Sequence, residues 1–441
     1  MWFWWIWTLG LLGWGLWTLR LLPWKSFFSI VFPIAFLRLA IFPTQRHEFI
    51  GHEAEYIKVF EGLLPTLGDT TFYPAVQIIW WLLGKVSFGL LSPLFWASLI
   101  GAASLWFWSQ AIHLYLPKIA AGKILLLGLV LSLHWLWSLS AYNVMLPFLC
   151  LCIAMWQIQK QQFWNIVPWM GLACALRMEM LLMWLLPLLW SFKDQKWQVV
   201  IVGAVISIIS VGGMLNHPIP GDGDWSWQNN WWLWQYYDAL LLWGIVGLFA
   251  QHENKQIQIG LWLVVALNHG LMSAFNDFSA RHVLVSMIPL GFLVAPLLKN
   301  GVLWLGLSIL SIFQLWMYRA IWYVQPEDFS AFLTEHYGDL PKMSLQEAQM
   351  RSCARVVEIE PFAQGIPLSH FNLWEPSEEM TLREQYSCID WCYTLEDWTW
   401  SSLGVRNRAI RLQGMYEITA VGIVWSSNAQ CLLFSVNKRL R

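Results

Sequence analysis

Charge is what this 441-residue sequence has least of. Only 12% of its residues are Asp, Glu, Lys or Arg, whereas 58% are hydrophobic and 35 are tryptophan. A soluble globular domain carries about a quarter charged residues. The composition therefore indicates that most of the chain is not an ordinary soluble domain. The sequence also lacks a dense basic patch, which argues against nucleic-acid binding.

Long apolar runs account for the missing charge. They approach the roughly 20 residues that cross a bilayer. We count roughly twelve such runs, at 1–19, 27–42, 74–92, 94–116, 122–140, 142–159, 163–192, 197–215, 232–250, 257–274, 283–299 and 301–322. We therefore predict an α-helical polytopic membrane protein with roughly 10–13 membrane segments.

The absence of Lys and Arg near the N-terminus helps to predict how the chain is oriented in the membrane. No Lys or Arg precedes Arg20, so the first run has no basic n-region of a cleavable signal peptide and is expected to be retained. Arg20 and Lys25 follow it, which favours a cytoplasmic turn and an outer N-terminus. The loop 44–73, after the second run, is then expected on the outer face.

Charged residues are more frequent after residue 324 than before it. Residues 1–324 hold 16 basic and 12 acidic residues, whereas residues 325–441 hold 10 and 15. We predict a transmembrane domain at 1–324 and a small soluble α+β domain at 325–441, in which alternation in "YEITAVGIVW" indicates a strand. If this tail lies outside the cytoplasm, two disulfides with three possible pairings are open to its cysteines, which are Cys353, Cys388, Cys392 and Cys431.

The loop 44–73 gathers five of those 12 acidic residues, namely Glu48, Glu53, Glu55, Glu61 and Asp69. Its segment from 52 to 61 is compatible with a short helix that has an apolar stripe including Tyr56 and Phe60. Glu53 would sit beside this stripe and face inward, whereas Glu55 would form a solvated pair with Lys58. An ordinary solvated loop is the alternative interpretation.

Two further polar spots lie in or next to apolar runs. Arg177 and Glu179 interrupt the run 163–192, which favours a broken or re-entrant helix, and a charge in such a place is a functional-site hypothesis. A structural ion pair is the alternative. Arg281 and His282 precede the run 283–299, where an arginine fork suits a phosphate. A positive-inside anchor is the alternative there.

Taken in order, these segments resemble the GT-C class of polytopic glycosyltransferases, especially bacterial members related to protein O-mannosyltransferases and aminoarabinose transferases. "HEAEY" from His52 matches the acidic "DEA-x-Y"-like motif of their first outer loop, with His52 in place of the usual Asp. "YPAVQIIWWLLGKVSFG" from Tyr73 matches a "YPP"-like start of the next span. "GLACALRMEMLLMWLLPLL" is similar to "GLA-x-L-x-R-x-E", and Arg281-His282 before "VSMIPL" is similar to an "RY"-like pair.

The resemblance implies a membrane glycosyltransferase at the outer face of a bacterial inner membrane. It would transfer a sugar from a polyprenyl-phosphate donor to an acceptor glycan, lipid or protein, in one displacement with inversion. Glu53 is the expected catalytic base, with Glu48 and Glu55 as the other candidates. Arg177 or Arg281 would stabilise the leaving phosphate. The candidate substrate-binding residues are His52, Tyr56, Tyr73, Arg177, Glu179, Arg281 and His282.

A metal and two other functions stay open. Some relatives use a divalent metal, so Mg or Mn held by Glu48 and Glu53 is a possible cofactor. His47 and His52 are five residues apart, which is not the spacing of a helical metal pair. A polytopic transporter or lipid-binding membrane protein, with Arg177, Glu179 and Arg281 along the substrate path, is the first alternative. An inactive glycosyltransferase-like scaffold, in which His52 has replaced the catalytic acid, is the second.

Overall fold

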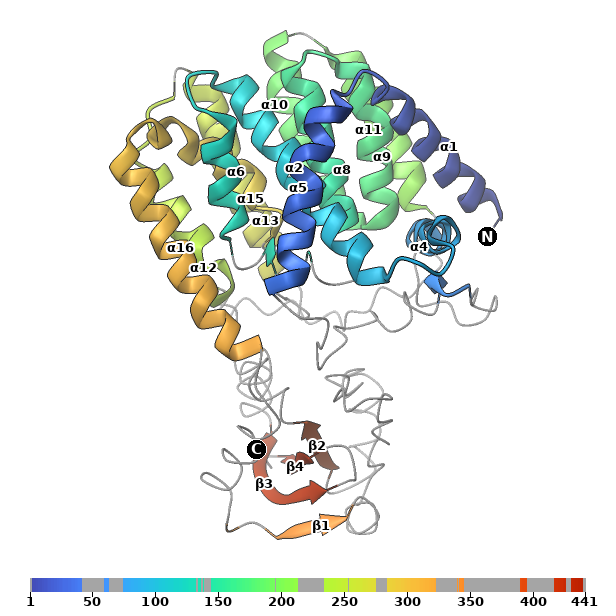
Figure 1. Cartoon of the computed structure of the whole chain (residues 1–441), viewed down its shortest axis with the longest axis vertical. Coiled ribbons are helices and arrows are strands. Elements are labelled where there is room, and N and C mark those ends of the chain that lie inside the picture. Colours follow the sequence, from blue (N-terminus) through green and yellow to red (C-terminus); the bar gives the residue numbers. More distant parts are fainter. Residues whose placement is uncertain are drawn as a thin grey trace. The chain divides into compact units, whose positions relative to one another are not determined.

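The computed structural model is mainly helical in the part of the chain that it describes (Figure 1). The residues that it describes are 2–41, 59–62, 74–131, 134–135, 138, 144–194, 196–212, 234–252, 254–274, 284–322, 339, 341–344, 389–394, 416–425 and 430–438.

The elements follow one another in chain order, with 3₁₀-helices labelled η. The helices are α1 (Trp2–Thr18), α2 (Trp24–Ile41), α4 (Pro74–Ser87), α5 (Pro93–Tyr115), α6 (Ala121–Leu129), α8 (Met145–Gln159), η1 (Phe163–Asn165), α9 (Ile166–Leu176), η2 (Met178–Trp184), α10 (Leu185–Asp194), α11 (Trp197–Val211), α12 (Trp234–Gly247), α13 (Lys255–Ala274), α15 (Met287–Val294), η5 (Ala295–Lys299) and α16 (Gly301–Trp322). The strands are β1 (Lys342–Ser344), β2 (Ile389–Thr394), β3 (Tyr416–Trp425) and β4 (Gln430–Lys438).

The chain separates into two compact units. One is built from helices, and the other contains the four strands. Within α16 the boundary between them falls at Leu315 and Trp316. The division into 1–324 and 325–441, with a catalytic loop at 44–73, stays a prediction.

Helix α8 lies between α5 and α9 in the helical unit. Nearly all its side chains are buried, because the segment is apolar on every face and such a helix must be surrounded by others. Helix α9 is buried along its whole length and also packs against α1 and α11. Helix α2 packs against α5 on the other side. These helices form the core that positions the polar residues discussed below.

Hydrogen bonds from tryptophan side chains tie these helices together. The indole N–H of Trp7 in α1 donates to Ser210 Oγ in α11 at 2.8 Å. The indole of Trp169 in α9 donates to Thr18 Oγ1 at 3.0 Å, and that of Trp184 in η2 to Ser207 Oγ at 2.8 Å. A buried indole N–H is costly without a partner, so each bond favours one particular alignment of its two helices.

The helices of the structure differ from the predicted polytopic membrane fold. No helix in the described residues combines the length and the apolar character needed to cross a membrane, so that prediction is wrong. Several apolar runs are interrupted: α6 ends at Leu129, the run 163–192 divides at Arg177, and α15 passes into η5 at Ala295. The 35 tryptophans contribute too, because each adds to the hydrophobic count although its indole N–H is polar.

The second unit contains a four-stranded sheet in the order β1–β3–β4–β2. Strand β4 pairs antiparallel with both β3 and β2, and β1 pairs parallel with β3. Strand β3 covers "YEITAVGIVW", where the alternation indicated a strand. A register shift between Ala420 and Gly422 marks a bulge in it.

The strand register bears on one of the possible disulfides. Cys392 in β2 lies opposite Leu433, and Cys431 in β4 lies opposite Thr394. The two cysteines are therefore diagonal neighbours, whose Cα atoms are typically about 7–8 Å apart. A disulfide usually joins Cα atoms about 4.4–6.8 Å apart, so this register does not favour the pair Cys392–Cys431. Cys353 and Cys388 lie outside the described residues.

Gly203 of α11 offers a test of the helical packing. A Cβ atom at this position would collide with the ring of Trp184, which its bond to Ser207 holds in place. We expect Gly203→Ala to lower the free energy of unfolding by about 1–3 kcal/mol, as overpacking does. Chemical denaturation followed by tryptophan fluorescence measures it.

Gly306→Ala in α16 is the matched control, because a Cβ atom there would have no neighbour within 4 Å. Alanine favours a helix over glycine, so we expect this variant to gain about 0.5–1 kcal/mol. Equal effects of the two substitutions would contradict the packing of η2 against α11.

Candidate functional site

Arg177 lies where the run 163–192 is interrupted, as the sequence indicated. Helix α9 ends at Leu176, and Arg177 adopts an extended backbone (φ −155°, ψ 122°) before η2 begins. Its side chain forms an ion pair with Glu179 through both Nε and Nη2. Arg177 is only 8% exposed, and Glu179 supplies the negative charge that a buried guanidinium needs. The ion pair that the sequence left as an alternative is therefore present.

Helix α4 brings a second predicted motif to this region. It begins within the "YPAVQIIWWLLGKV" segment and packs against α9 and α1. Its first seven residues, Pro74–Trp80, are all buried. The segment that leads to Arg177 and the segment that follows Tyr73 are thus neighbours in the helical unit, although about a hundred residues separate them in the chain.

The middle of the acidic loop 44–73, at Val59–Gly62, packs on α4. The rings of Phe60 and Trp80 are 6.3 Å apart, and the backbone of Phe60 approaches Gly84 so closely that no Cβ atom fits there. Phe60 is buried and Glu61 is exposed, which agrees with the predicted inward apolar stripe at this residue. Gly62 has a positive φ of 101°, a conformation that favours glycine.

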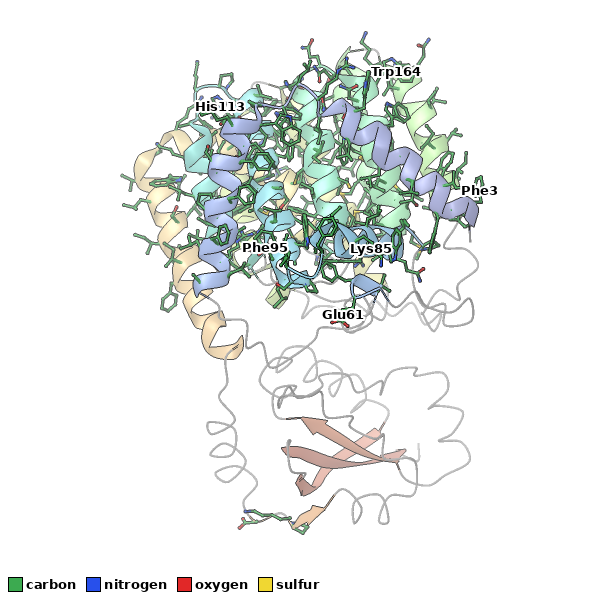
Figure 2. The ribbon with its side chains drawn as sticks, turned by 45° about the vertical axis from the view of Figure 1, so that its right-hand side comes forward. Phe3, Glu61, Lys85, Phe95, His113 and Trp164 are labelled. Carbon is green, nitrogen blue, oxygen red and sulfur yellow. The ribbon has the colours of Figure 1, made fainter. Side chains whose placement is uncertain are left out.

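Two opposite edges of the helical unit can be followed in Figure 2. Glu61, Lys85 and Phe95 lie at one edge, and His113 and Trp164 lie at the opposite edge. Helix α9 begins directly after η1, which contains Trp164.

The other predicted site residues lie outside the described residues. They are Glu48, His52, Glu53, Glu55, Tyr56, Tyr73, Arg281 and His282. The carboxylates named for a divalent metal, Glu48 and Glu53, are among them. In the described part of the chain, no three His, Cys, Asp or Glu side chains form a group that could hold a metal ion.

A second polar cluster joins α2, α5 and the residues after α6. Arg38, one turn before the end of α2, is completely buried. Its Nη2 lies 2.8 Å from Nδ1 of His134, and Nε2 of His134 lies 2.9 Å from Ser104 Oγ in α5. Ser104 Oγ in turn donates to the carbonyl oxygen of Gly101 at 2.7 Å. The guanidinium carbon of Arg38 is 5.3 Å from the ring centre of Trp135, within cation–π range.

Burial fixes the protonation states in this cluster. It lowers the pKa of His134 well below its usual value, with the charge of Arg38 as a second cause, so the imidazole is neutral. Because Arg38 is a donor only, Nδ1 of His134 accepts and Nε2 carries the proton, which it donates to Ser104. Burial also lowers the pKa of Arg38 to about 9, which still leaves the guanidinium charged near pH 7.

Sequence analysis missed this cluster. Arg38 and His134 are 96 positions apart, and each is a single titratable residue between apolar neighbours, in "FLRLA" and "SLHWL". Isolated charge in an apolar run was the available signal, the same one that pointed to Arg177. The two residues meet because α2 and the segment after α6 both lie against α5.

Comparisons of the chain with protein families, curated proteins and solved structures found no match. The resemblance to glycosyltransferases of the GT-C class therefore rests on the sequence motifs alone.

The buried histidines predict how stability depends on pH. Burial lowers the pKa of His134, His252 and His269, so below about pH 6.5 the unfolded chain binds protons that the folded chain does not. Stability is therefore greatest above pH 6.5 and is lost as the pH falls. For fully buried His134 the loss is up to about 1.4 kcal/mol per pH unit. Denaturation curves between pH 7.5 and 5 measure it.

His134→Gln should flatten this pH dependence, because one of the titrating groups is gone. Ser98→Ala is the control, since Ser98 only donates to the carbonyl oxygen of Ala35 and should shift stability equally at every pH. A His134→Gln profile parallel to the wild type would contradict a neutral, buried His134.

Proposed function

We propose that this protein is a glycosyltransferase that takes its sugar from a polyprenyl-phosphate-linked donor. The acceptor is a glycan, lipid or protein at the outer face of the cell membrane. An acceptor hydroxyl, deprotonated by Glu53, attacks the anomeric carbon while the polyprenyl phosphate leaves, and the configuration inverts. Glu48 and Glu55 are the alternative bases.

The observation that carries this proposal is the packing of α4 against α9. Three segments of the resemblance are neighbours in pairs. The middle of the acidic loop, at Val59–Gly62, lies on α4, the helix after Tyr73. Helix α4 in turn packs against α9, the helix that leads to Arg177. A sugar transfer that uses a carboxylate base and a phosphate leaving group needs the residues that serve both close together. The proximity of these segments supports the proposed glycosyltransferase in addition to the order of the motifs in the sequence.

The environment of Arg177 suits a leaving phosphate. The side chain is largely buried, where a charge acts more strongly than in water. Its ion pair with Glu179 holds the guanidinium in one orientation, so less freedom is lost when a phosphate binds. A guanidinium placed where negative charge develops stabilises the transition state of such a transfer.

Exposed apolar side chains next to the same core suit the lipid part of the donor. Helix α11, which packs against α9, exposes Ile201, Val205 and Ile208 at 50–62%. Helix α1, which also packs against α9, exposes Ile6 and several further large apolar residues. Exposed apolar side chains of this kind suit contact with lipid or another apolar partner.

Sugar transfer from a labelled polyprenyl-phosphate sugar in membrane preparations tests the proposal. We expect transfer by the wild type, a loss of at least about a hundredfold in Glu53→Gln if it is the general base, and a loss of roughly tenfold or more in Arg177→Gln. Lys160→Gln is the control for Arg177, because Lys160 lies at the end of α8 and contacts Trp156.

Three outcomes would count against parts of the proposal. Unchanged transfer by Glu53→Gln would remove Glu53 as the base. Unchanged transfer by Arg177→Gln would remove the phosphate contact. Donor binding without transfer by the wild type would contradict the enzyme and favour a lipid-binding protein, a transporter or an inactive scaffold.

A further inference from the structure

Arg38 carries a positive charge into the interior of the helical unit. It is completely buried, and burial alone accounts for its lowered pKa. An ion withdrawn from water loses several kcal/mol of solvation unless an opposite charge accompanies it. Among the described residues no Asp or Glu forms an ion pair with Arg38, in contrast to Arg177.

Within the described residues, the groups that face Arg38 are neutral. From α5 they are Gly101 and Ser104, and from the segment after α6 they are His134, Trp135 and Ser138. Gly101 lets the guanidinium approach α5, because a Cβ atom there would lie 2.9 Å from Nη1 of Arg38. The ring of Trp135 attracts the guanidinium by a cation–π contact, which replaces only part of the lost solvation.

Hydrogen bonding satisfies only one nitrogen of the guanidinium in the described residues. Nη2 donates to His134, which the bond to Ser104 holds in one tautomer. Nε and Nη1 are buried and have no hydrogen-bond partner there. Leaving N–H donors of a buried charged group without acceptors carries a larger desolvation penalty than leaving neutral groups unbonded. The guanidinium of Arg38 is therefore held in one orientation but lacks acceptors for part of its N–H groups.

We propose that Arg38, oriented by His134 and Ser104, binds the phosphate group of a ligand through its unused N–H groups. A phosphate provides both the missing negative charge and several acceptor oxygens around one centre. The ligand is either a polyprenyl phosphate or free phosphate, which offer the same anion. Because Arg38 is closed off in this structure, binding includes an opening of the last turn of α2.

This proposal goes beyond sugar transfer. It requires neither Glu53 nor Arg177, and a phosphate-bearing lipid bound at Arg38 need not be a sugar donor. A protein that binds polyprenyl phosphate at Arg38 but transfers no sugar would support the present site and contradict the proposed function. The two proposals therefore fail separately.

Binding and thermal unfolding of the full-length protein in detergent test the site. The ligands are inorganic phosphate, polyprenyl monophosphate in mixed micelles, and the uncharged polyprenol. We expect phosphate or polyprenyl phosphate to raise the unfolding temperature of the wild type, whereas polyprenol does not. Tighter binding of polyprenyl phosphate than of inorganic phosphate identifies a lipid ligand, and equal binding identifies free phosphate.

Arg38→Met removes the buried charge but keeps a long side chain. We expect it to weaken phosphate binding at least roughly tenfold and to unfold, without ligand, at the same temperature as the wild type or higher. Ser104→Ala should weaken binding by a smaller factor, because it only frees His134. Arg20→Gln is the control, since Arg20 is exposed and stacks on Trp17, and it should bind as the wild type does.

Three results would overturn the proposed phosphate binding at Arg38. Equal phosphate affinity of Arg38→Met and the wild type would overturn the proposal. So would an Arg38→Met protein that unfolds at a lower temperature without ligand or fails to fold, because Arg38 would then be a structural residue. A wild type that responds to none of the phosphate ligands would overturn it as well.

Discussion

Every polar group inside the apolar helical unit needs a partner from within that unit. The indole N–H groups of Trp7, Trp169 and Trp184 find hydroxyl oxygens on neighbouring helices, and these bonds select how the helices align. Apolar packing by itself tolerates many alignments. These three indole–hydroxyl bonds therefore help to fix how α1, α9, α11 and η2 align.

The same requirement distinguishes the two buried arginines. Arg177 sits at the end of α9, where Glu179 completes its charge, and the helix break allows both side chains to meet. Arg38 lies inside α2 with a neutral histidine and a serine, so its charge is oriented without being balanced. We interpret Arg177 as a residue already oriented to contact the phosphate of the sugar donor. We interpret Arg38 as a residue whose charge a bound anion would balance.

Sequence reasoning succeeded where one local signal decided the structure. The charge pair in "ALRMEM" indicated the break at Arg177, and the alternation in "YEITAVGIVW" indicated β3. It failed on the fold class, because apolar run length was counted with tryptophan as fully apolar and without the breaks that divide the runs. It also missed the cluster of Arg38 and His134, since no local pattern reports a contact between residues 96 positions apart. Of the candidate site, only Arg177 and Glu179 lie in the described residues.

In the proposed reaction the donor phosphate binds at Arg177, which directly follows α9. A structure of the full chain with a non-reactive polyprenyl-phosphate sugar analogue tests it most directly. We expect a phosphate oxygen about 3 Å from the guanidinium of Arg177, with the carboxylate of Glu53 on the side of the anomeric carbon that faces away from the phosphate. A bound analogue with no phosphate oxygen at Arg177, or Glu53 on a separate face of the helical unit, would contradict it.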